Sequence, residues 1–242
     1  MKIIIPFFST FLCILVFSCS DSISLEERLA VQLENDGVLQ QGSIEVTPVK
    51  YKKEYALQEL SLESEEVKEA KHKLNLQFKE TLPKGYEIHY TVNNGPFIIS
   101  KTAKIELEML EGNNVVLAFL SLANGLRIPN EKAVFLKNYV LGGEQQSDIT
   151  ETGIHLFHHL SNYADSSGLF LDFYAKNVAE GSNYFARVIT DGNQFNLSLH
   201  KAFQLDGLTK GYHDIRIQLV DGSGNVVDGP FNDTGVISIK VE

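Results

Sequence analysis

The sequence has very few residues that could stabilise or functionalise a fold through sulfur chemistry. Its 242 residues include two cysteines and no tryptophan. Cys13 lies inside the first apolar run and Cys19 lies just after it. If that run is removed and Cys19 is modified, no thiol remains for a disulfide, a cysteine-ligated metal site or a cysteine nucleophile. The folded part must then be stabilised by burial of its apolar side chains.

Positive charge is also scarce. The chain has 21 Lys and Arg residues against 31 Asp and Glu residues, which gives a formal net charge of −10. No local cluster of basic residues offsets this balance, and an acidic surface repels phosphate groups. Nucleic acid is therefore not an expected partner.

Signatures of catalysis and of cofactor binding are absent from the sequence. It contains no Gly-x-Ser-x-Gly elbow, no Walker loop and no dinucleotide-binding fingerprint. Asp221–Asn225 has the oxygen spacing of a calcium loop, but Val226 replaces the required glycine and Asn232 the required glutamate. This segment is predicted to be a hairpin turn, and the protein is predicted to be neither an enzyme nor a cofactor carrier.

The N-terminus has the organisation of an export signal. Met1-Lys2 is a short basic segment, and Ile3–Phe17 is an uncharged apolar run, shorter than a membrane-spanning helix of about 20 residues. The run ends at Val16-Phe17-Ser18-Cys19, and the chain then turns polar. The pattern predicts a signal peptide over residues 1–18. An ordinary secretory signal and an uncleaved anchor helix are the alternatives, and both also export the chain.

A small residue directly before Cys19, at the end of an apolar run, resembles the lipobox of bacterial lipoproteins. The resemblance implies that the Cys19 thiol takes a diacylglyceryl group, that the chain is cut before Cys19, and that the new amine is acylated. Several acyl chains anchor a protein stably, because each buried CH₂ contributes about 0.8 kcal/mol. The expected location is the cell envelope, on the outer membrane, with the periplasmic or surface face left open.

Residues 19–45 are predicted to form a tether between the lipid and the folded part. Within it, residues 24–36 have a capping box at their start and an apolar face that predicts a short helix. The leucines of that face are Leu25, Leu29 and Leu33. A helix of this length is not stable in isolation.

Beyond the tether the pattern is that of β-strands, and one order of strands occurs twice. The matching segments are Leu74–Phe78 with Leu169–Phe173, Tyr86–Val92 with Tyr184–Thr190, and Val115–Leu122 with His213–Leu219. In each copy the second segment leads into a turn dipeptide, Asn94-Gly95 or Asp191-Gly192, which favours a tight hairpin. The two copies are offset by roughly 95 residues, which indicates an internal duplication.

Short strands with frequent turn signals and no helical repeat predict an all-β fold of two tandem immunoglobulin-like β-sandwich domains. The first domain is expected over residues 46–141 and the second over residues 161–242, with an inter-domain linker over residues 142–160. Each half has a full set of strand and turn signals, so each is expected to fold alone.

A family resemblance agrees with this architecture. Gly211–Asn225 resembles the penultimate strand and turn of Ig-like modules in bacterial envelope proteins. The chain from Cys19 onward resembles a group of Gram-negative envelope lipoproteins with tandem Ig-like domains, through Leu169–Tyr174, the Asp191-Gly192 hairpin and Val227–Asn232. The resemblance implies a fold and a cellular location, and it assigns no functional residue.

Three histidines between the two repeats are the only candidate metal ligands. His155, His158 and His159 could together bind zinc or copper. On a strand, however, His155 and His159 would face one side and His158 the other, and no acidic residue stands at ligand spacing nearby. Packing between the domains is the favoured interpretation, and a metal site is the alternative.

These observations together predict a non-catalytic, lipid-anchored binding or scaffolding protein of the cell envelope, held on the membrane through Cys19. Its partner would be an envelope protein, a peptide or a glycan, and its ligand-binding residues are not identifiable from the sequence. Capture of a carbohydrate or a peptide as an accessory to uptake is one alternative. A histidine-based metal-binding protein or enzyme is the other.

Overall fold

The computed structural model describes residues 37–52, 55, 57–79, 82–142, 150–162, 168–179 and 181–241. The signal peptide predicted over residues 1–18, Cys19 and the helix expected over residues 24–36 lie outside the described residues. The described part is built of strands, with short 3-10 turns at Glu69–Lys71 and Glu131–Ala133. None of its helices is long and apolar enough to span a membrane.

The N-terminal sandwich consists of two antiparallel sheets. One has the order β3-β4-β7 and the other the order β6-β5-β8-β9. The strands are β3 (Leu62–Lys68), β4 (Lys73–Phe78), β5 (Tyr86–Val92), β6 (Ile98–Ser100), β7 (Lys104–Glu108), β8 (Gly112–Leu122) and β9 (Val134–Leu141). Leu74, Leu76 and Phe78 of β4 pack against Ile88 of β5 and Val116 of β8, forming the core between the sheets.

The C-terminal sandwich repeats this order. One sheet has the order β13-β12-β15-β16, and the other contains β14-β11-β10 extended by the hairpin β1-β2. The strands are β10 (His155–Asn162), β11 (Leu169–Lys176), β12 (Tyr184–Thr190), β13 (Asn193–Leu197), β14 (Phe203–Asp206), β15 (Gly211–Asp221), β16 (Ile237–Val241), β1 (Leu39–Gln41) and β2 (Ile44–Pro48).

The predicted duplication is confirmed by the positions of the strands in the sheets. β4 lies between β3 and β7, and β11 lies likewise between β10 and β14. β5 with β12 and β8 with β15 occupy equal places in the two four-stranded sheets. The Asp191-Gly192 turn is confirmed as well, because Thr190 pairs with Asn193 and both turn residues have positive φ. In the N-terminal copy the positive φ angles fall one residue earlier than expected, on Asn93 and Asn94.

The domain boundaries differ from those expected from the sequence. Residues 39–48, which were assigned to the tether and the first domain, form the β1-β2 hairpin and pair with β14 of the C-terminal sandwich. Residues 155–160, which were assigned to the linker, belong to β10. Val46 shows the physical reason, since it is fully buried in the C-terminal core beside Leu205. A C-terminal half that begins at residue 148 would lack this hairpin.

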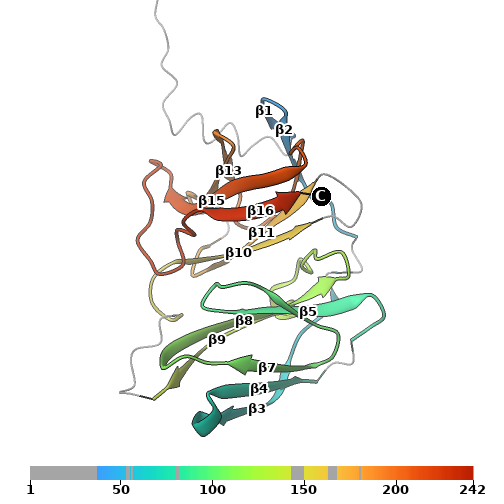
Figure 1. Ribbon diagram of the computed structural model, residues 1–242, viewed down its shortest axis with the longest axis vertical. Coiled ribbons are helices and arrows are strands. Elements are labelled where there is room, and N and C mark those ends of the chain that lie inside the picture. Colours follow the sequence, from blue (N-terminus) through green and yellow to red (C-terminus); the bar gives the residue numbers. More distant parts are fainter. Residues whose placement is uncertain are drawn as a thin grey trace, which may run out of the picture.

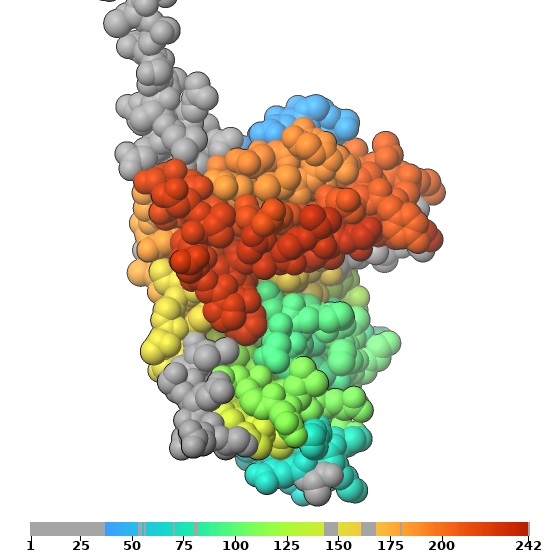
Figure 2. Space-filling model, turned by 60° about the vertical axis from the view of Figure 1, so that its left-hand side comes forward, coloured from blue at the N-terminus to red at the C-terminus, as the bar shows by residue number. Residues whose placement is uncertain are grey.

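The four sheets are stacked in layers (Figure 1). The β5-β8 sheet of the N-terminal sandwich faces the β10-β11 sheet of the C-terminal one, so β8 and the first half of β11 are covered on both faces. Strands buried on two faces have continuous apolar runs, and Asn114–Ser121 of β8 is buried throughout. The blue β1-β2 hairpin lies at the far end of the stack, on the C-terminal sandwich (Figure 2).

Candidate functional site

The contact between the two sandwiches, here called the seam, is lined by large apolar side chains. Val115, Leu117 and Phe119 of β8 form one buried cluster with Phe157 of β10 and with Phe231. The Phe157 and Phe231 rings are 5.1 Å apart between centroids. These side chains belong to neither sandwich core, so the seam is a third apolar core shared by the two halves.

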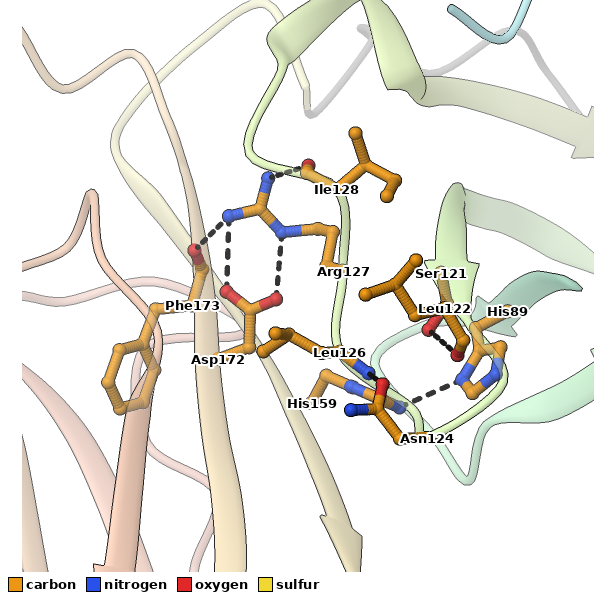
Figure 3. A network of polar contacts seen from close by, with 10 residues as sticks. All are labelled: His89, Ser121, Leu122, Asn124, Leu126, Arg127, Ile128, His159, Asp172 and Phe173. Carbon is orange, nitrogen blue, oxygen red and sulfur yellow. Dashed lines mark hydrogen bonds and ion pairs between the residues drawn. The ribbon is translucent and has the colours of Figure 1, made fainter. Parts of the chain in front are cut away.

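A buried ion pair crosses the seam. Arg127, from the β8–β9 connection, donates from Nε and Nη2 to the two carboxylate oxygens of Asp172 on β11, at 3.0 and 3.1 Å. Its Nη2 also donates to the carbonyl oxygen of Phe173 (Figure 3). Burial disfavours the charge on Arg127, but the Asp172 carboxylate outweighs it and raises the pKa of the guanidinium. Both partners are nearly inaccessible, with side chains 11% and 2% exposed.

Two histidines meet beside this ion pair. His89 Nδ1 of β5 lies 3.1 Å from His159 Nε2 of β10, and His89 Nε2 lies 3.6 Å from Glu87. Burial lowers the pKa of both imidazoles, and that of His159 falls well below its ordinary value. With both rings neutral, one of the two facing nitrogens donates its proton to the lone pair of the other, so the two imidazoles bond each other without a charge.

Two asparagine side chains bind the free edge of β10. Asn232 accepts from Leu156 N and donates to Ile154 O, at 2.9 and 2.8 Å. Asn94 accepts from His158 N and donates to Leu156 O, both at 3.4 Å. Each amide therefore satisfies backbone groups of the edge strand that would otherwise lack a partner within the protein.

A groove of about 530 Å³ opens next to these contacts. It runs between β10 and β16, which are edge strands of the two sheets of the C-terminal sandwich, and the β5–β6 loop of the N-terminal sandwich closes one side. Most of its walls are apolar. The lining side chains used below are Phe97, His158, Leu160, Phe231, Ile237 and Ile239.

The three candidate metal ligands do not converge. They lie on β10, with His155 and His159 facing the seam and His158 lining the groove. His155 Nε2 is bonded to Thr152 O at 2.8 Å, whereas His159 contacts His89. In the described part of the chain no group of three or more His, Cys, Asp or Glu residues is placed to hold a metal ion.

The Asp221–Asn225 segment is a turn that its own carboxylate organises. Asp221 Oδ1 accepts from the backbone N–H groups of Ser223 and Asn225, both at 2.9 Å. The amide side chain of Asn225 donates to the other carboxylate oxygen at 3.3 Å. These bonds lower the pKa of Asp221. The arrangement agrees with the predicted hairpin turn.

Sequence reasoning missed the residues that hold the seam together, although one of them carries a signal. Asp172 interrupts the apolar run Leu169–Phe173, and a buried carboxylate demands a cationic or hydrogen-bonded partner. Nothing in the sequence selects Arg127 as that partner. The sequence predicts a turn at Asn94, and it does not indicate that the Asn232 side chain bonds the edge of a strand.

The strand order defines the class of protein: two immunoglobulin-like β-sandwiches in tandem. No protein-family model and no curated protein matches the chain. Among solved structures it is similar to the FN1-FN3 domains of chicken CNTN1, at 9% identity and a TM-score of 0.25, covering 76% of this chain and 66% of that one. It is also similar to the fibronectin(III)-like modules of Clostridium thermocellum CbhA, at 9% identity and a TM-score of 0.21, covering 70% and 84%. The fold assignment rests on the strand order itself.

Proposed function

We propose that this chain is a non-catalytic, lipid-anchored binding protein of the bacterial envelope. Its two sandwiches act as one body that presents the groove between β10 and β16. The observation that carries the proposal is the seam, where apolar burial and a bidentate ion pair join the halves. A rigid scaffold that positions a concave, mostly apolar site is typical of binding modules.

The chemistry of the seam favours a structural role over catalysis. Arg127 and Asp172 neutralise each other, and His89 and His159 bond each other inside the contact. A general acid or base must reach a substrate, and these groups are turned toward one another across a buried interface. The metal-binding alternative predicts a tight zinc or copper site, and a titration monitored by calorimetry should find none.

The lipid anchor is tested by labelling cells with an alkyne fatty-acid probe. Wild type and Cys13→Ala should incorporate the probe equally, because Cys13 lies in the segment that is removed. Cys19→Ala should incorporate none and should no longer partition into detergent. Equal labelling of Cys19→Ala would refute the anchor.

The binding role is tested separately, with a photo-crosslinking amino acid placed in the living cell. At Ile237 in the groove, it should yield discrete crosslinked products. The matched control position is Tyr212 on β15, which is 77% exposed on the outward sheet. The crosslinking amino acid at this position should yield no crosslinked products. Equal or absent crosslinking at both positions would count against the groove as the binding face.

A further inference from the structure

The edge of β10 carries a regular series of backbone hydrogen-bonding groups. Alternate residues of a strand point their N–H and C=O groups to opposite sides. In β10 the outward series includes Leu156 and His158, because Asn232 and Asn94 bind them there. The same alternation turns the backbone of Leu160 outward, since β10 is the edge strand and pairs only with β11.

The two asparagine amides copy the contacts of a neighbouring strand. Each accepts from the N–H of one residue and donates to the C=O of the residue two positions before it. A residue of a parallel strand makes this pair of bonds. Asn232 occupies the backbone groups of Ile154 and Leu156, and Asn94 occupies those of Leu156 and His158.

The next pair of outward backbone groups on β10 lies at the groove. This pair is the C=O of His158 and the N–H of Leu160, and the side chains of both residues line the groove. No partner for these two backbone groups is found in the described part of the chain. One further amide would continue the pattern that Asn232 and Asn94 begin.

The rest of the groove fits an uncharged, apolar side chain. Ile237 and Ile239 of β16 face this position from the opposite sheet, and Phe97 and Phe231 border it. Burial lowers the pKa of His158 to about 4, so its ring is neutral at physiological pH. Asp233 also lines the groove, but its carboxylate is bonded by Arg216 and Gln218.

We infer that the groove binds an extended peptide segment, which adds as a strand to β10 beside His158 and Leu160. The N–H of one peptide residue donates to the C=O of His158, and the C=O of the same residue accepts from the N–H of Leu160. An apolar side chain of the peptide enters between β10 and β16. Main-chain bonds supply affinity and the apolar pocket supplies selectivity, as in other cases of strand addition to a sheet edge. This inference gives the proposed binding role a class of partner, and it does not depend on the lipid anchor.

The test uses the chain from Ser20 onward, labelled with ¹⁵N, and two blocked pentapeptides. One is acetyl-Thr-Val-Thr-Val-Thr-amide, and the other has the same side chains with both valine nitrogens methylated. The first peptide should shift the Leu160 amide resonance in a saturable way, because that N–H gains a hydrogen bond. The methylated peptide cannot donate from its valines and should shift it at least fivefold less at equal concentration.

Two variants locate the site. Ile237→Ser should weaken binding about fivefold, the equivalent of about 1 kcal/mol of lost apolar contact. Tyr212→Ser, on the outward sheet, should leave it unchanged. Equal shifts with both peptides, or shifts that map to another sheet edge, would overturn the inference. So would a Leu160 amide that is already protected from exchange and does not respond to peptide, because the chain itself would then occupy the position. Crosslinking at Ile237 without peptide binding would support the groove as a binding site and refute only the peptide as its ligand.

Discussion

The two sandwiches share one strand order but bury opposite sheets in the seam. The N-terminal sandwich contributes its four-stranded sheet, through β5 and β8, and the C-terminal sandwich contributes the sheet that contains β10 and β11. The contact is therefore formed by two different surfaces of one repeated fold. At the N-terminal end of the stack, β3 is largely exposed and rich in glutamate.

Corresponding strands record this difference in their sequences. β8 reads GNNVVLAFLSL and is buried on both faces, whereas its counterpart β15 reads GYHDIRIQLVD and alternates between buried and exposed residues at its start. The sheets that contain β4 and β11 show the reverse. β11 begins LFLDF, which is buried throughout, whereas β4 alternates as KLNLQF. In each pair of corresponding strands, the one with the continuous apolar run belongs to the sheet that packs against the other sandwich.

The seam contains an ion pair and a histidine pair that are both buried. Arg127 with Asp172, and His89 with His159, lie among the apolar side chains of the seam. Apolar burial alone fixes no unique docking arrangement, and a bidentate pair does so through its geometry. Polar groups in the seam therefore set the alignment of the two halves, which the apolar groups stabilise.

The largest effect is expected from breaking the buried ion pair. Asp172→Ala leaves the Arg127 guanidinium buried without its counter-ion, which should lower the free energy of unfolding by about 3–5 kcal/mol. Chemical denaturation measures this loss. The double variant Arg127→Met/Asp172→Leu should recover most of it. Glu106→Gln, which breaks an exposed ion pair with Lys73, should leave the midpoint unchanged. A loss as large in Glu106→Gln would contradict the distinction between the seam and the surface.

A smaller effect is expected where the β1-β2 hairpin, which only the C-terminal sandwich has, meets β14. Gly207 has φ of +86°, and a Cβ there would lie 1.9 Å from the carbonyl oxygen of Ser43. Gly207→Ala should cost about 3 kcal/mol and should increase hydrogen exchange in β1 and β2. Gly192→Ala is the matched control, since its φ is +78° with no atom near the new Cβ, and it should cost about 1 kcal/mol. Equal losses of unfolding free energy in the two variants would show that the Ser43 backbone does not pack closely against Gly207.

The smallest effect is expected from pH, with opposite signs in the seam and on the outward sheet. The folded-state pKa values of His89 and His159 lie below their unfolded value of about 6.5. Their contribution to stability is therefore present above about pH 6.5 and is lost as the pH falls toward the folded values. His213 on β15 has a raised pKa, through the Thr209 carbonyl and Asp191, so its contribution is present at acid pH and is lost as the pH rises.

Thermal melts between pH 7 and pH 5 measure this contrast. The melting temperature of the wild type should fall on acidification. The fall should be smaller in His89→Leu/His159→Phe, which removes the seam imidazoles, and larger in His213→Asn. Identical slopes in all three proteins would show that these histidines do not couple proton binding to folding. The other titratable or charged groups near the pair, Glu87, Arg127 and His158, are the same in each protein.

The sequence predicted much of the fold and little of the site, for physical reasons. Alternation and turn dipeptides are local, so the strands, their duplicated order and the Asp191-Gly192 turn could be predicted. The place of β2 could not, because Ile44–Pro48 has the same pattern whichever sandwich it joins. Arg127 and Asp172 are 45 residues apart, and their pairing depends on how two folded sheets dock. Only the placement of Asp172 within an apolar run hinted that a partner exists.

If the seam makes the two sandwiches one cooperative unit, hydrogen exchange during denaturation should show it. The chain from Ser20 onward is compared with Phe157→Ala, which opens a cavity in the seam at a cost of about 3–5 kcal/mol. Exchange is followed in β8 of the N-terminal sandwich and in β15 of the C-terminal one. We expect a single transition, in which both strands lose protection together and shift by the same amount in the variant. Two separate transitions, or a shift confined to β15, would contradict it.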